Sequence, residues 1–210
     1  MRTKQRLLGL KEWLQKECCV GRLMKTPGSG ITEIAQAEPR VFLAWFPKRP
    51  DESGMGESDP ENVVPSILVM PNPSRGKMME EKRFDRYSGV KRPKDLGQTL
   101  AVSMLLSVWE PGNRLPGFAE TGDMKLLTEG TEDGLFTLYD WMDTVRDKLL
   151  SQLSIPGTDL LLDEESVVYS LYTDQSFVVD KRPIFYGFVN AEFYCYAETE
   201  PQKNVLENLL

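Results

Sequence analysis

The stretch Thr99-Leu-Ala-Val-Ser-Met-Leu-Leu-Ser-Val-Trp109 decides the fold of this chain. Its even positions are all apolar, whereas its odd positions include Thr99, Ser103 and Ser107. Successive side chains of a β-strand point to opposite faces of a sheet, so this alternation predicts a long strand with one buried face.

A second long strand is predicted at residues 184–197. Its odd positions from Phe185 to Ala197 are small or apolar, and the polar residues Asn190 and Glu192 share the other face. That other face also carries the aromatic side chains of Tyr186, Phe188, Tyr194 and Tyr196. A face so rich in aromatic residues is poorly suited to bare solvent, and we expect a second protomer to cover it.

Two amphipathic helices are predicted, one on either side of the first long strand. The first covers residues 5–19, where apolar residues recur at helical spacing, and it ends near Gly21. The second follows Thr131 as N-cap, has Glu132 and Asp133 in its first turn, and stops at Pro156. Its expected buried stripe is Leu135, Leu138, Tyr139, Met142, Val145, Leu149 and Leu153.

Shorter strands are predicted at residues 40–46, 63–70 and 167–173, and residues 25–30 are predicted to form a loop. Pro65 indicates that its strand either lies at a sheet edge or starts late. The order α-β-β-β-α-β-β predicts an α+β fold: a mixed, largely antiparallel sheet with two helices packed on one face and long charged loops. Residues 1–210 are expected to form one domain, because 40% hydrophobic content at this length suffices for a core without disulfide bonds.

Overall charge and cysteine content narrow the class of protein. The formal net charge of -7 and the sequence pI of about 4.9 disfavour a protein that coats nucleic acid through its overall field. Tryptophan and tyrosine could stack on bases, although core or interface packing is their more common role. Three cysteines with two adjacent, together with no signal-like or membrane-length apolar run, predict a protein of the reducing cytoplasm.

Two connections are rich in charge. Residues 49–62 are acidic and rich in turn-forming residues. Residues 72–95 hold eight basic and four acidic residues, a local net charge of +4 that leaves -11 for the rest of the chain. This asymmetry favours a docking loop whose main contacts are Arg83, Arg86, Lys91 and Arg92, and the alternative is a solvated loop with internal ion pairs.

The sequence predicts no catalytic residue, no metal site and no cofactor. With no histidine, imidazole-based hydrolysis and His-ligated metal sites are excluded, and no phosphate-binding loop is present. One alternative is a magnesium-dependent nuclease, whose acidic residue and E-x-K pair are imitated by Asp51 with Glu80, Glu81 and Lys82. These residues lie in predicted loops, whereas such sites need ligands held on strands.

Residues 198–210 form an expected C-terminal tail. Pro201 ends the last strand, and Leu206, Leu209 and Leu210 recur at helical spacing. A helix this short becomes ordered only when its leucines dock on a partner, and a frayed tail is the alternative.

Four stretches resemble tail-associated proteins encoded by phages and by phage-like contractile tail particles of Gram-positive bacteria. They are Glu81-Lys-Arg-Phe-Asp-Arg-Tyr87, Gly97-Gln-Thr-Leu continuing to Trp109-Glu-Pro-Gly112, Gly134-Leu-Phe-Thr-Leu-Tyr-Asp-Trp-Met-Asp143 and Tyr186-Gly-Phe-Val-Asn-Ala-Glu-Phe193. The resemblance covers about residues 80–197, and the element order is similar to that of the tail terminator. Because the chain is longer than a minimal terminator, a head-completion or neck adaptor protein is the neighbouring alternative.

The resemblance implies a homo-oligomeric ring, most simply a hexamer, at the head-proximal end of the tail tube, where it stops polymerisation of tube and sheath. The implied partners are further copies of the chain, tail tube and sheath proteins, and neck or collar proteins, with DNA only passing through the ring and no membrane. The implied location is the bacterial host cytoplasm during assembly and then the virion or tail particle. A monomeric binding module is a further alternative. The candidate interface residues are Arg83, Arg86, Tyr87, Lys91, Arg92, Tyr186, Tyr194, Tyr196, Leu206, Leu209 and Leu210.

Overall fold

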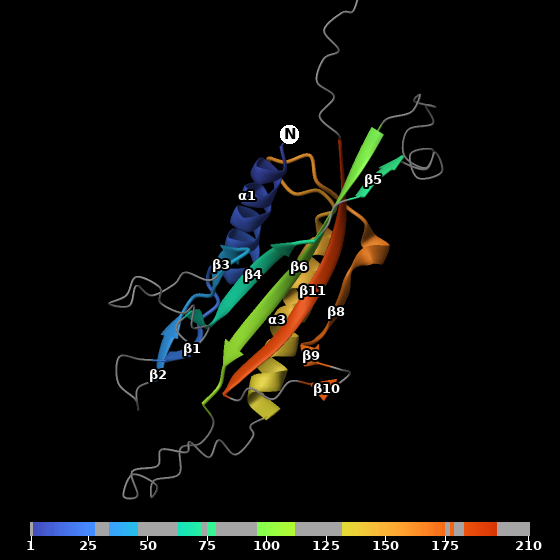
Figure 1. Ribbon diagram of the computed structural model, residues 1–210. Helices are drawn as coiled ribbons and strands as arrows, with labels where there is room; N and C mark the ends of the chain where they lie inside the picture. Colours follow the sequence, from blue (N-terminus) through green and yellow to red (C-terminus); the bar gives the residue numbers. More distant parts are fainter. Residues whose placement is uncertain are drawn as a thin grey trace, which may run out of the picture.

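Two helices cover one face of a mixed, largely antiparallel β-sheet, which confirms the predicted α+β fold (Figure 1). The computed structural model describes residues 2–27, 34–45, 63–72, 75–78, 96–111, 132–174, 177–178 and 183–196, and structural statements below refer to these residues.

The two long strands form the centre of the sheet. Strands β6 (Leu96–Trp109) and β11 (Ile184–Tyr196) pair antiparallel from Trp109 opposite Ile184 to Gly97 opposite Tyr196. The other strands of this sheet are β3 (Arg40–Leu43), β4 (Ser66–Pro71), β5 (Arg75–Met78), β7 (Leu161–Leu162) and β8 (Val168–Leu171). Their order is β3-β4-β6-β11-β7, with β5 also on β6 and β8 also on β11. Only β3 and β4, among these described pairs, run parallel.

Two small hairpins lie outside the main sheet, and one of them corrects a prediction. β1 (Met24–Pro27) pairs with β2 (Ile34–Ala37), and β9 (Thr173–Asp174) pairs with β10 (Phe177–Val178). The prediction that residues 25–30 form a loop is therefore wrong for Lys25 to Pro27. Met24 is buried, and the Thr26 hydroxyl donates to the Val64 carbonyl at 2.7 Å, so tertiary contacts hold this short strand. The expected loop at residues 72–95 likewise contains β5.

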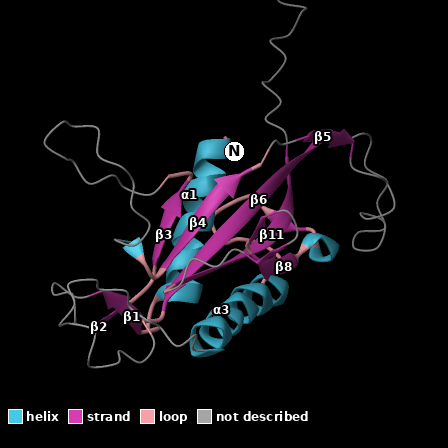
Figure 2. Cartoon of the chain, turned by 60° about the horizontal axis from the view of Figure 1, so that its bottom comes forward, coloured by secondary structure: helices cyan, strands magenta, loops and turns pink. Residues whose placement is uncertain are grey.

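Both helices lie on the same face of the sheet. Helix α1 (Thr3–Leu14) continues into a π-helical turn (Gln15–Cys19), and Gly21 follows with a φ of +80°. Helix α3 (Glu132–Ser151) packs against β6 and β11, and α1 packs against β3 (Figures 1 and 2). A short 3-10 turn, Glu164–Ser166, leads into β8.

The core lies between the helices and the face of the sheet that carries the alternating apolar residues of β6 and β11. Even residues of β6 and odd residues of β11 point into it, and Leu106, Val189 and Phe193 are 0% exposed. Gly187 allows α3 to approach closely, because a Cβ atom at this position would lie 2.5 Å from the Met142 sulfur.

The buried stripe of α3 differs from the predicted one. Leu138, Met142, Val145 and Leu149 are buried as predicted, but Tyr139 is 36% exposed and Leu135 is only half-buried. Trp141 takes the central place instead: it is 0% exposed, and its indole Nε1 donates to the Cys18 carbonyl at 3.1 Å. Trp141 is buried because α3 also packs against the π-helical turn that continues α1.

The boundaries of two strands depend on local turns. β4 starts directly after Pro65 and lies between β3 and β6, so the late start is confirmed and the edge position is wrong. β3 ends at Leu43 rather than near residue 46, because the Trp45 amide donates to the Leu43 carbonyl at 2.7 Å around Ala44, whose φ is +61°.

Candidate interaction surfaces

The sheet face opposite the helices is a candidate interaction surface, here called the helix-free face. The register brings Leu68, Leu105 and Phe188 side by side across β4, β6 and β11. On the neighbouring row, the buried hydroxyls of Ser66 and Ser107 lie 2.7 Å apart. The face is therefore apolar in its middle, where the buried hydroxyls of Ser66 and Ser107 pair with each other.

Aromatic rings gather where β8 meets β11. The Tyr172 ring makes edge-on contacts with Tyr186 and Phe188, with both centroid distances at 6.5 Å. Tyr172 and Val168 are 41% and 57% exposed. Tyr186 also packs on a small separate cluster formed by Val64, Trp109 and Ile184. Aromatic residues with exposed edges are typical of protein interfaces.

The structure brings together only part of the predicted interface. Tyr186 and Tyr194 lie on the helix-free face as predicted and are half-buried, and the Tyr194 hydroxyl donates to Asp163 Oδ2 at 2.8 Å. Tyr196 belongs to β11 and lies opposite Gly97 in the register. The other predicted interface residues lie outside the described residues: Arg83, Arg86, Tyr87, Lys91, Arg92, Leu206, Leu209 and Leu210. The residues of the nuclease alternative, Asp51, Glu80, Glu81 and Lys82, also lie outside them.

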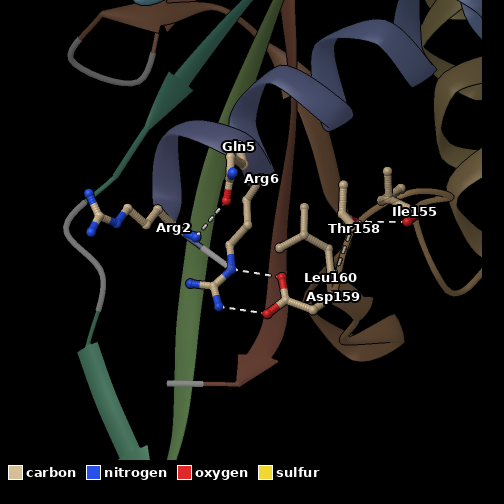
Figure 3. A network of polar contacts seen from close by, with 7 residues as sticks. All are labelled: Arg2, Gln5, Arg6, Ile155, Thr158, Asp159 and Leu160. Carbon is tan, nitrogen blue, oxygen red and sulfur yellow. Dashed lines mark hydrogen bonds and ion pairs between the residues drawn. The ribbon is translucent and has the colours of Figure 1, made fainter. Parts of the chain in front are cut away.

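A partly buried ion pair fixes α1 to the segment that follows α3 (Figure 3). Arg6 is 2% exposed, and its Nε and Nη2 atoms donate to the two carboxylate oxygens of Asp159 at 2.8 and 2.7 Å. This hydrogen bonding lowers the pKa of Asp159 below its ordinary value. The loop that carries Asp159 is itself closed by Thr158, whose hydroxyl donates to the Ile155 carbonyl and accepts from the Leu160 amide. These bonds hold the N-terminal part of α1 against the loop that follows α3, which is a structural role.

The outer edge of β3 is closed by a side chain. Gln15 Oε1 accepts from the Val41 amide, and Gln15 Nε2 donates to the Pro39 carbonyl, both at 3.0 Å. The carboxamide thus occupies the place that a neighbouring strand would take. Capping of this kind protects an edge strand from pairing with other chains.

The outer flank of α3 is a surface that the sequence prediction missed. Phe136, Tyr139 and Leu150 are 60%, 36% and 39% exposed. Arg146 lies among them: it is within 2.9 Å of Asp143 and 2.8 Å of Asp147, and its guanidinium carbon is 5.2 Å from the centroid of the Tyr169 ring. Phe136 and Leu150 were the available signal, because both are large apolar residues outside the buried stripe predicted for this helix.

The described thiols are unsuited to chemistry. Burial raises the pKa of both Cys18 and Cys19 to about 12, and burial also raises the pKa of Cys195. All three are free and buried. Among the described residues, no group of three His, Cys, Asp or Glu side chains is placed to hold a metal ion. No helix in this part of the chain has the length and apolar character needed to cross a membrane.

Comparison with known proteins does not assign the chain to a family. No protein-family model matches the sequence, and no curated protein matches it at a significant level. The surfaces described above are therefore the basis for the functional proposal.

Proposed function

We propose that this protein is a structural component of a phage or phage-like tail, the tail terminator. It forms a ring on the head-proximal end of the tail tube, stops polymerisation there and connects the tail to the neck. The proposal is supported by the resemblance of residues 80–197 to such proteins and by the α+β architecture, whose helices cover one face of the sheet and leave the other face for contacts.

The helix-free face is the single observation that supports a contact function best. One face of the sheet is closed by helices, whereas the other presents Phe188, Tyr186 and Tyr172 with no helix over them in the described part of the chain. A group of partly exposed aromatic side chains marks a protein contact more often than a catalytic site. A ring of subunits covers such a face and hides sheet edges from other chains.

The charged segment at residues 72–95 has a matching role in this proposal. Its net charge of +4 on a chain with a net charge of -7 suits contact with an acidic neighbour. Arg83, Arg86, Lys91 and Arg92 contact a neighbouring subunit or tail protein, and Leu206, Leu209 and Leu210 dock on an adjacent subunit or on the next ring.

The mass and symmetry of the particle test the proposal. Mass photometry and multi-angle light scattering of the full chain are expected to give a closed oligomer, and electron microscopy is expected to show rings that cap tail tubes. A ring that binds neck proteins but leaves tube length unchanged supports the neck adaptor instead. A monomer both in solution and on the tail rejects a ring, and magnesium-dependent cleavage of DNA would make the protein a nuclease.

A further inference from the structure

Charge is segregated between the two ends of the sheet. β3 lies at one end, with α1 beside it, and β8 lies at the other end, with α3 beside it (Figures 1 and 2). Apart from Arg6, which pairs with Asp159, residues 2–16 contain four basic residues and one acidic residue, whereas residues 163–172 contain three acidic residues and no basic one. The two ends of the described subunit therefore carry opposite charge.

The basic end follows one stripe of α1. Gln15, through its bonds to β3, marks the flank of α1 that faces outward at this end. Lys4, Leu8 and Lys11 precede Gln15 by eleven, seven and four residues, a spacing that places all of them on the same stripe. Leu8 is 39% exposed and Lys4 is exposed.

Two exposed residues of the β3 segment lie at the same end of the sheet as this stripe. Arg40 is exposed at the start of β3, and Trp45, just after the strand, is 76% exposed. No ion pair is found for Lys4, Lys11 or Arg40 within the described part of the chain. We call Lys4, Leu8, Lys11, Arg40 and Trp45 the basic edge.

The acidic end follows one stripe of α3. Arg146 marks the flank that faces β8, because its Nη1 donates to the Tyr169 hydroxyl at 3.0 Å. Tyr139, Asp143 and Leu150 share this flank, being seven and three residues before Arg146 and four after it. Asp143 and Asp147 both contact Arg146, so two carboxylates face one guanidinium and the stripe remains negative.

The acidic character continues at both ends of that stripe. Glu132, seven residues before Tyr139, is exposed in the first turn of α3. Beyond β11, Glu164 is exposed in the turn before β8. We call Glu132, Tyr139, Asp143, Leu150 and Glu164 the acidic edge.

We propose that the basic edge of one copy of this chain binds the acidic edge of the next copy. Opposite charges steer and align such a contact, and both edges add exposed apolar side chains that can be buried in it. Two different surfaces meeting head to tail give a ring when the rotation closes. The contact is made by side chains rather than by extending the sheet, because Gln15 already caps the outer side of β3. The inference rests on the proposed ring and adds a contact between the two ends of the sheet to the contact proposed at the helix-free face.

A charge swap tests this contact. Variant Lys11→Glu with Arg40→Glu makes both edges acidic, and variant Glu132→Lys with Glu164→Lys makes both edges basic. Each variant alone is expected to lose at least about tenfold in self-association, since like charges then meet at every contact. An equimolar mixture is expected to assemble again, because each edge then finds an opposite charge on the other variant. Mass photometry of each variant and of the mixture, in low and high salt, measures this.

Two single substitutions serve as matched controls. Lys16→Glu makes the same change of charge as Lys11→Glu, but outside the basic edge. Lys16 lies 100° round the helix from Gln15, and its side chain is 81% exposed. Asp133→Lys alters the same helical turn as Glu132→Lys and carries the same cost at the helix N-terminus. Both controls are expected to assemble as the unaltered chain does, and circular dichroism checks that all variants are folded.

The outcomes separate the contact from the proposed function. If the swapped variants still assemble singly, the ring uses other surfaces and this inference is overturned while the ring stands. If the variants are folded but their mixture does not assemble, charge pairing between these edges is refuted. If the unaltered chain itself stays monomeric at every concentration, the ring of the proposed function fails together with the inference.

Discussion

The two faces of the central sheet are built from the same strands but follow different rules. On the helix-covered face, β11 places Val189 and Phe193 in a core where both are 0% exposed. On the helix-free face, Tyr186 and Phe188 of the same strand are only half-buried. The difference teaches that alternation along one strand can serve two purposes: one face specifies the fold, and the other remains available for contact.

The largest expected effect separates the two faces directly. Phe193→Ala should lower the free energy of unfolding by about 3–5 kcal/mol, because it leaves a cavity in the closed core. Phe188→Ala, on the opposite face of the same strand, should lower it by only about 1 kcal/mol in the monomer. Urea denaturation followed by tryptophan fluorescence measures both. Equal losses at low protein concentration would show that the helix-free face is already part of a closed core.

The ion pair that anchors α1 should give the next largest effect. Asp159→Asn is expected to cost about 2–4 kcal/mol near pH 7, because the buried, charged guanidinium of Arg6 would lose the carboxylate that it binds through two nitrogens. Asp140→Asn is the matched control: Asp140 also pairs with an arginine, Arg22, but its side chain is 72% exposed, and its loss should cost less than about 1 kcal/mol.

The same pair predicts a pH dependence with a defined sign. The pKa of Asp159 is lowered in the folded state, so its stabilising contribution is fully present above the ordinary pKa of a carboxyl group. The contribution is lost as the pH falls through the lowered value. The stability difference between the unaltered chain and Asp159→Asn should therefore shrink below about pH 4. A difference that stayed constant down to pH 2 would mean that the carboxylate is not stabilised by Arg6.

A smaller effect is expected at the buried hydroxyl pair of the helix-free face. Ser66→Ala or Ser107→Ala alone should cost about 1–2 kcal/mol, because the remaining hydroxyl loses its 2.7 Å partner. The double substitution should cost less than the sum of the two, since neither hydroxyl is then left unpaired. A double-mutant cycle from thermal unfolding gives the coupling, and strictly additive losses would argue that water already satisfies the pair.

The last prediction concerns the reactivity of the thiols rather than stability. Cys18 and Cys19 have pKa values raised to about 12 by burial, so a thiol reagent at pH 8 should react with them at least about a hundredfold more slowly than with an exposed thiol. Ser170→Cys, exposed on β8, supplies that exposed thiol. Absorbance of the released thiolate measures the rates. Rapid labelling of the native cysteines would indicate that the helical layer opens readily.

The sequence predicted most of the architecture, because its strongest patterns are local. Period-two alternation locates β6 and β11, and helical periodicity locates α1 and α3. The places where prediction failed depend on neighbours: Trp141 is buried because the end of α1 lies beside it, and Lys25 to Pro27 form a strand because Thr26 bonds to the distant Val64. Contacts of this kind cannot be read from spacing.

The candidate surfaces were predictable to a lesser degree. The aromatic residues Tyr186 and Tyr194 were assigned to the correct face of the last strand by their parity. The acidic edge was missed, since it joins a stripe of α3 to Glu164 beyond β11, and only the folded sheet brings these segments to the same end. The charges were visible in the sequence, but their separation between two ends of the molecule was not.

The pairing of β6 with β11 also governs when the subunit can fold. These strands meet across a sequence separation that grows from Trp109–Ile184 to Gly97–Tyr196, so the central ladder is made of very long-range contacts. Such contacts slow folding, because the ends of a long loop must come together before any bond repays the loss of chain entropy. During synthesis, roughly 90 residues must follow β6 before β11 is complete, about 5–18 s at ordinary translation rates. For that interval β6, the longest strand in the described part of the chain, has no partner on one side, and a ribosome-associated chaperone that shields exposed strands would have its largest effect on this chain then.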